Sequence, residues 1–265
     1  MKRKSLLALS LILMFGLMAS AHDTWLLPRQ TTIVPGAMVR LDLTSGMLFP
    51  ALDYSIKPDR IDVARCRLNG KTFAITQLAS APKSLALRVR LMDPGSATLW
   101  VELKPKSLEL NPKQVQEYFD EINAPPAFRK SWEETKEPKR WRETYTKHAK
   151  TFVKVGDASD NSWAEPVGMA LEIVPETDPT KLRAGADLTV RVLKDGAPLP
   201  HFTLGKVREG NVLSEFRETD AEGRVTFRLA RSGQWLLRGT DLRRSTQPET
   251  EWESHFTTLT IAVAK

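Results

Sequence analysis

The sequence predicts a mainly β protein made of two β-sandwich domains. Short apolar stretches alternate with polar residues along most of the chain, tight turn signals separate these stretches, and one central stretch changes to a helical period. We expect residues 22–163 to form the first sandwich, with a helical insertion at about 107–150. Residues 166–265 should form the second sandwich.

The first 21 residues predict a secretory signal peptide. Three basic residues at positions 2–4 precede an apolar run from Leu6 to Met18, and the small residues Ala19-Ser20-Ala21 follow as a cleavage pattern. The run is shorter than the roughly 20 residues that span a bilayer. We expect cleavage after Ala21, a mature protein without a membrane span, and a periplasmic or secreted location. An uncleaved anchor is the alternative.

Composition and motifs exclude several classes of protein. The net charge is +7 without a long basic run, so we expect no nucleic-acid partner. Cys66 is the single cysteine, which excludes an intrachain disulfide and cysteine-rich metal sites, and its strand pattern predicts a buried thiol. The chain has no nucleophile elbow, phosphate-binding loop or dinucleotide motif, so no catalytic residues are predicted.

Strand patterns fill most of the first domain. The pair Asn69-Gly70 is the strongest hairpin signal in the chain. The predicted strands cover residues 32–34, 38–43, 60–68, 71–78, 84–91, 97–103 and 151–155.

Two helices are predicted between these strands. Asn111 is a helix cap followed by Pro112, and the helix ends before Pro125. A second, highly charged helix is predicted from about Ala127 to His148, because its aromatic residues recur at helical spacing.

Strand patterns return in the second domain. They cover residues 169–174, 188–193, 225–229, 234–238 and 257–263. About seven short strands in about 100 residues predict an immunoglobulin-like or prealbumin-like sandwich. The seven tryptophans are expected mostly in the cores, whereas a row of exposed tryptophans would indicate sugar binding.

Five sequence segments resemble the bacterial domain-of-unknown-function 4198 family, and together they span nearly the whole mature chain. They are His22–Pro28, Tyr145–Gly156, Gly168–Pro175, Gly233–Thr240 and Trp252–Thr260. The resemblance implies an exported protein, grouped loosely with periplasmic components of cobalt or nickel uptake. Separately, Leu193–Leu199 and Thr219–Val225 resemble the prealbumin-like carboxypeptidase-regulatory module, a non-catalytic sandwich.

The mature amino terminus carries the sharpest chemical clue. After cleavage behind Ala21, His22 would carry a free α-amine and an imidazole, whose nitrogens can close a chelate ring on one transition metal. Their ordinary pKa values, near 8 and about 6.5, allow both to bind Ni, Co or Cu near neutral pH. Asp23 can orient the ring or simply be solvated. Alternatively, His22 is only the residue at which the peptidase cuts.

The other histidines can complete such a site. His255 lies on a predicted strand face and His148 on a predicted helix face, and either can instead be an ordinary packed histidine. His201 follows a proline and is expected to be exposed. We therefore name His22, His255 and His148 as candidate metal ligands, although no two histidines have the spacing of a known metal motif.

These observations favour an exported, non-enzymatic binding or accessory protein for a divalent transition metal. Its expected partners are the metal ion and an uptake transporter or another envelope protein. The alternative is a non-catalytic module that binds a partner protein or a glycan at the cell envelope. A third hypothesis, a copper enzyme with an N-terminal histidine brace, requires a second histidine that faces His22.

Overall fold

The computed structural model describes residues 22–136, 138–158, 160–211 and 213–265. It is mainly β with two short α-helices, and three sheets form its sandwiches, which confirms the predicted fold class. The predicted signal peptide lies outside the described residues. Within them, no helix has the length and apolarity needed to cross a membrane.

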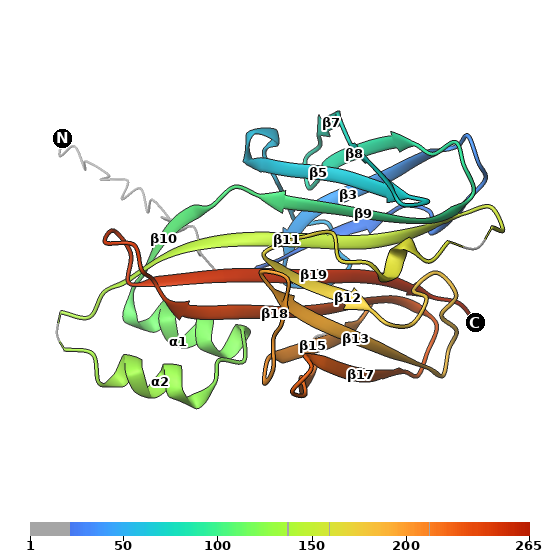
Figure 1. Ribbon diagram of the computed structural model, residues 1–265. Helices are drawn as coiled ribbons and strands as arrows, with labels where there is room; N and C mark the ends of the chain where they lie inside the picture. Colours follow the sequence, from blue (N-terminus) through green and yellow to red (C-terminus); the bar gives the residue numbers. More distant parts are fainter. Residues whose placement is uncertain (1–21, 137, 159, 212) are drawn as a thin grey trace, which may run out of the picture.

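A ten-stranded sheet runs through the whole molecule (Figure 1). Its central strands, β11 (Trp141–Val155) and β19 (Trp252–Val263), pair in parallel from Glu143 and Trp252 onward. Outward from β19 the order is β18 (Gly233–Arg244), β15 (Thr203–Arg208) and β16 (Glu215–Glu218). Outward from β11 it is β9 (Gly95–Leu103), β5 (Ile61–Leu68) and β6 (Lys71–Ala74), while β2 (Thr32–Ile33) and β10 (Lys106–Leu110) also pair with β11.

A five-stranded sheet covers the first half of the large sheet. Its strands are β1 (Asp23–Pro28), β3 (Met38–Gly46), β4 (Tyr54–Ser55), β7 (Gln77–Ser80) and β8 (Leu85–Arg90). The core between the two sheets is aliphatic, with Leu41 and Leu87 from one sheet buried with Leu99 and Val153 from the other. The β1 strand reaches the centre of the large sheet, where the Thr258 hydroxyl donates to the Thr24 carbonyl oxygen.

A four-stranded sheet covers the second half. It contains β12 (Leu171–Pro175), β13 (Ala186–Lys194), β14 (Ala197–Pro198) and β17 (Arg224–Leu229). Its core includes Phe227, Leu237 and Ile261, and it also takes in Phe152 from β11. The two cores therefore meet across β11, and the proposed boundary between residues 163 and 166 divides a molecule whose largest sheet is continuous.

All seven tryptophans are buried, with exposures of 1% to 9%, which agrees with the expectation that most of them lie in the cores. Trp141 and Trp252 stack at a ring-centroid distance of 4.4 Å beneath the helices α1 (Pro112–Glu121) and α2 (Pro126–Glu133). The tryptophans therefore fill the cores and do not form a sugar-binding row.

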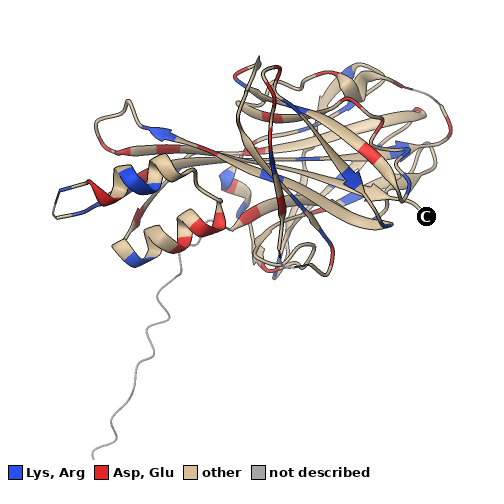
Figure 2. Cartoon of the chain, turned by 90° about the horizontal axis from the view of Figure 1, so that it is seen from below, with Lys and Arg blue, Asp and Glu red and all other residues tan. Residues whose placement is uncertain are grey.

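Charges of both signs are interspersed over the helices and strands (Figure 2).

The predicted second helix is wrong beyond Glu133, over about its last two thirds. The helix α2 ends at Glu133, and residues from Trp141 through His148 belong to β11 instead. Thr144, Tyr145 and Thr146 favour an extended backbone, and β10 and β19 pair with this stretch on either side. Because β11 is largely buried on both faces, its sequence lacks the alternation that identifies a half-exposed strand.

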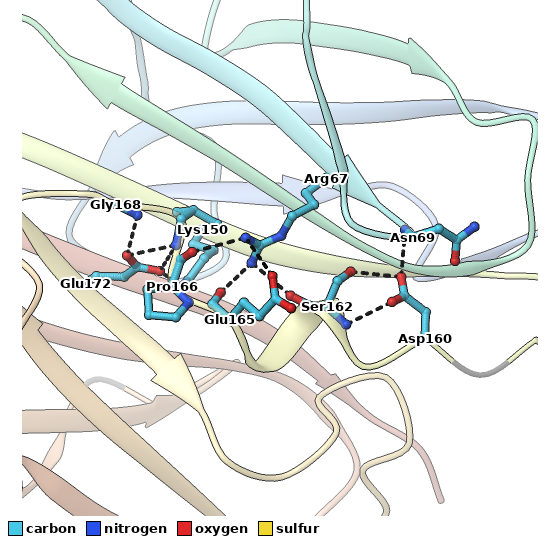
Figure 3. A network of polar contacts seen from close by, with 10 residues as sticks. Arg67, Asn69, Lys150, Asp160, Ser162, Glu165, Pro166, Gly168 and Glu172 are labelled. Carbon is cyan, nitrogen blue, oxygen red and sulfur yellow. Dashed lines mark hydrogen bonds and ion pairs between the residues drawn. The ribbon is translucent and has the colours of Figure 1, made fainter.

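The segment between the sandwiches is held by buried charges (Figure 3). The Arg67 guanidinium donates to the carbonyl oxygens of Ser162, Glu165 and Pro166. Nearby, the Lys150 ammonium contacts the Glu172 carboxylate at 2.6 Å, with both side chains 1% exposed. The backbone N–H groups of residues 167–169 also donate to Glu172. These contacts tie residues 162–169 to β5 of the first sandwich and β12 of the second.

Candidate functional site

His22 lies immediately before β1 and is partly buried. Its ring packs against Tyr54 at a centroid distance of 5.0 Å. The antiparallel pairing of Asp23 with Gly46 places the amino end of β1 beside the loop between β3 and β4. This loop presents Met47 and Leu48 to solvent, with exposures of 67% and 55%.

Two basic residues surround the backbone next to His22. The Lys147 ammonium donates a hydrogen bond to the His22 carbonyl oxygen and lies over the rings of Tyr145 and Phe256. Arg238 pairs with Asp23 at 2.7 Å. The Asp23 carboxylate therefore has a cationic partner, in addition to any role in orienting His22.

The electrostatics of His22 favour a neutral ring. Burial lowers the pKa of the His22 imidazole and Lys147 lowers it further, whereas the carboxylates of Asp53 and Asp23 raise it. A neutral imidazole has a free nitrogen lone pair, which is the form that binds a metal.

His148 and His255, which are 107 residues apart in sequence, meet on neighbouring strands. Nε2 of His148 lies 3.3 Å from Nδ1 of His255. The ring planes differ by 11° and the centroids are 5.6 Å apart. The centroid distance is about the nitrogen distance plus two ring radii, so the rings meet end to end in nearly one plane. We call this contact the histidine pair.

Each outer nitrogen of the histidine pair faces a carboxylate. Nδ1 of His148 is 3.1 Å from Glu102, and Nε2 of His255 is 3.1 Å from Glu253. Burial lowers the pKa of His255, the Lys194 ammonium adds to this effect, and the Glu253 carboxylate opposes it. The side chains of His148 and His255 are 1% and 11% exposed.

The three predicted ligands do not converge. Lys147 and His148 are consecutive in β11, so their side chains point to opposite faces of the sheet. Lys147 reaches His22, and the histidine pair therefore lies on the other face. The structure brings two of the predicted ligands together and separates them from the third.

The remaining polar candidates behave differently. His201 is exposed, as expected, and has a positive φ of 55° in the turn before β15. Cys66 is buried in β5, as predicted, and burial raises the pKa of its thiol to about 12. No group of three or more His, Cys, Asp or Glu residues that could hold a metal ion occurs in the part of the chain that the structure describes.

Sequence reasoning missed the two carboxylates. Glu253 precedes His255 by two residues, so the period of a strand puts both on one face, and this spacing could have identified it. Glu102 carries no local signal, because it contacts His148 only through the pairing of β9 with β11.

The model of one protein family covers most of the chain. The domain of unknown function DUF4198 matches residues 19–240. The chain belongs to the DUF4198 family. This confirms the resemblance drawn from the five sequence segments, and the family description itself states no activity. A comparison with curated proteins found no match for the DUF4198 chain.

Solved structures of bacterial adhesins are similar to the DUF4198 chain. The D0-D1 domain of intimin is 11% identical, with 91% of this chain and 97% of that chain covered and a TM-score of 0.24. The adhesin InvE of Yersinia pseudotuberculosis is 13% identical, with 89% and 58% covered and a TM-score of 0.24. The Escherichia coli adhesin FdeC is 12% identical, with 93% and 65% covered and a TM-score of 0.26. Likenesses at this level carry no argument about function.

Proposed function

We propose that the protein is an exported binding or accessory protein for a divalent transition metal, Ni, Co or Cu, with His22 as the anchoring ligand. The observation that supports this proposal is the environment of His22. Its imidazole lies partly buried before the first strand, its pKa is lowered, and the carboxylates of Asp53 and Asp23 act on it electrostatically.

The chemistry depends on processing after Ala21. Cleavage there would add the α-amine of His22 to its imidazole, and both nitrogens can bind one ion. A carboxylate such as that of Asp53 suits the same ions as a further ligand. The nearby Lys147 ammonium opposes cation binding, while its hydrogen bond to the His22 carbonyl oxygen holds the backbone of this residue in place.

The proposal extends to location and partners. A metal-binding protein of this kind would work in the periplasm or outside the cell and deliver its ion to an uptake transporter or another envelope protein. The loose grouping of the family with cobalt and nickel uptake supports this by association. A copper enzyme would need a second imidazole facing His22, and the histidine pair lies on the opposite face of the sheet, so we do not extend the proposal to catalysis.

The test is calorimetric titration of the processed, metal-stripped protein with Ni, Co and Cu. Mass spectrometry first verifies that the protein starts at His22. A matched control is acetylated at the His22 α-amine, which removes the chelating amine and retains the imidazole. Tight one-to-one binding that the control loses supports the proposal. Equal and weak binding by both proteins contradicts it.

One observation favours a second function. Met47 and Leu48 are exposed beside His22, and Tyr54 is 53% exposed. These side chains suit a non-catalytic module that binds a partner protein or a glycan at the cell envelope. Replacing Met47 and Leu48 by serine would weaken such binding without changing metal affinity. Pull-down from envelope extracts and glycan arrays, each with both proteins, would separate the two functions.

A further inference from the structure

The two facing nitrogens of the histidine pair are placed to bind one cation between them. Carboxylate oxygens accept hydrogen bonds, so the outer nitrogens of the pair are placed to donate to Glu102 and Glu253. Two neutral rings would then direct two lone pairs at each other across 3.3 Å. This arrangement becomes favourable when one cation, either a shared proton or a metal ion, binds both lone pairs.

The carboxylates complete a pattern that is typical of metal-binding imidazoles. A histidine that ligates a metal usually donates its other N–H to a carboxylate, which fixes the tautomer and makes the ring more basic. Both rings of the pair have this arrangement, one through Glu102 and one through Glu253.

The number and direction of the nitrogen ligands determine which metal ion fits the histidine pair. The rings offer two nitrogens in line, and the described residues provide no group of three or more ligating side chains here. A divalent transition metal on two nitrogens completes its four or more ligands with water, which reaches the partly buried His22 far more readily than this buried pair. Monovalent copper accepts two imidazoles in linear coordination, and its single charge is the less costly one to bury beside side chains that are 1% and 11% exposed.

We propose that His148 and His255 form a buried, two-coordinate site for Cu(I), separate from the His22 site. Two metal–nitrogen bonds of about 2 Å in line place the nitrogens about 4 Å apart, so the rings must separate by less than about 1 Å. His255 supplies this movement, because it is the more exposed ring and its partner Glu253 is 39% exposed. The proposal does not depend on metal binding at His22.

The experiment measures Cu(I) transfer from its bicinchoninate complex to the full mature protein under anaerobic conditions. Every protein in the experiment carries His22→Ala, so the terminal site is removed. We expect one equivalent of Cu(I) to bind. His148→Gln and His255→Gln should abolish this binding, and Glu102→Gln should weaken it by about 10- to 100-fold. The matched control, His201→Asn, changes an exposed histidine and should bind like the parent.

X-ray absorption of the Cu(I)-loaded parent protein decides the case even if the histidine variants fail to fold. Two nitrogen ligands at one distance, without sulfur, support the proposal. Sulfur ligation would assign the ion to Cys66 or to methionines and overturn it. The proposal is also overturned if the parent takes up no Cu(I), or if the folded His148→Gln variant binds as tightly as the parent.

Discussion

Lys150 and Glu172 form a buried ion pair that also accepts the N–H groups at the start of the second sandwich. Burial lowers the pKa of Lys150, while Glu172 opposes the change. Removing one member of such a pair leaves the other charge buried without compensation. We predict that Lys150→Met lowers the free energy of unfolding by about 3–5 kcal/mol in urea titrations.

A surface pair provides the matched comparison. Lys113 and Glu117 lie 3.8 Å apart, with side chains 85% and 53% exposed. Lys113→Met should change stability by less than about 0.5 kcal/mol. If both methionine variants lose the same stability, burial of the Lys150 charge is not the cause of its effect.

The lowered pKa of Lys147 predicts how the stability of the fold depends on pH. Burial lowers its pKa to about 8, against the opposing effects of Asp23 and Glu121, while Arg60 lowers it further. Between about pH 8 and pH 10.5 the unfolded lysine binds more protons than the folded one, so this group makes stability rise with pH. Below pH 8 the folded protein carries the full cost of the buried charge.

The Lys147→Met variant isolates this contribution. Its advantage in stability over the parent should be largest below pH 8 and shrink as the pH rises toward 10.5. Urea titrations of both proteins at several pH values measure the difference. A difference that stays constant with pH would mean that the pKa of Lys147 is not lowered in the fold.

Cys66 should be inert in the folded protein. Its thiol is buried and its pKa is raised to about 12, so the reactive thiolate is almost absent at pH 8. We expect a disulfide reagent to modify one thiol per chain in denaturant and almost none in the native state. Rapid native modification would show that β5 opens readily.

At the scale of single elements, the helix α1 was predictable and α2 only in part. The Asn111 side chain accepts a hydrogen bond from the Gln114 backbone N–H, and the Gln114 side chain accepts one from the Asn111 backbone N–H. Both hydrogen bonds of the expected helix cap are therefore present. Asn111→Ala should lower the free energy of unfolding by about 1 kcal/mol. Asn111→Ser, which retains a capping oxygen, is the control and should be nearly neutral.

The hairpin at Asn69-Gly70 was also predictable, because residues next to each other in sequence decide its turn. Asn69 and Gly70 both have positive φ, at 51° and 72°, as the turn between β5 and β6 requires. The conformation of such turns is decided by adjacent residues. The strand that begins at Trp141 was not predictable, because its pairing partners lie in β10 and in the distant β19.

At the scale of the whole molecule, the sequence predicted sandwiches and did not predict the sheet that joins them. For the candidate site too, the sequence predicted the residues and did not predict how they come together. His148 and His255 were identified from their residue type and position. Their contact depends on the parallel register of β11 and β19, which no local pattern specifies.

The continuous sheet predicts how the molecule unfolds. Both cores include β11, and β19 pairs with β11 over nine residues from Glu143 to Thr151. We expect one cooperative transition in calorimetry, with equal calorimetric and van't Hoff enthalpies. Two separated transitions would indicate that the sandwiches unfold independently despite their shared sheet.

The position of β19 also constrains how the protein is made. The strand lies between β18 and β11 in the middle of the sheet, yet it begins only at Trp252, 97 residues after β11 ends at Val155. A nascent chain cannot close the sheet until these residues have left the ribosome and, in an exported protein, the translocation channel. Until then β11 and β18 expose unpaired edges, so biogenesis requires that the chain be kept from aggregating until β19 has been synthesised.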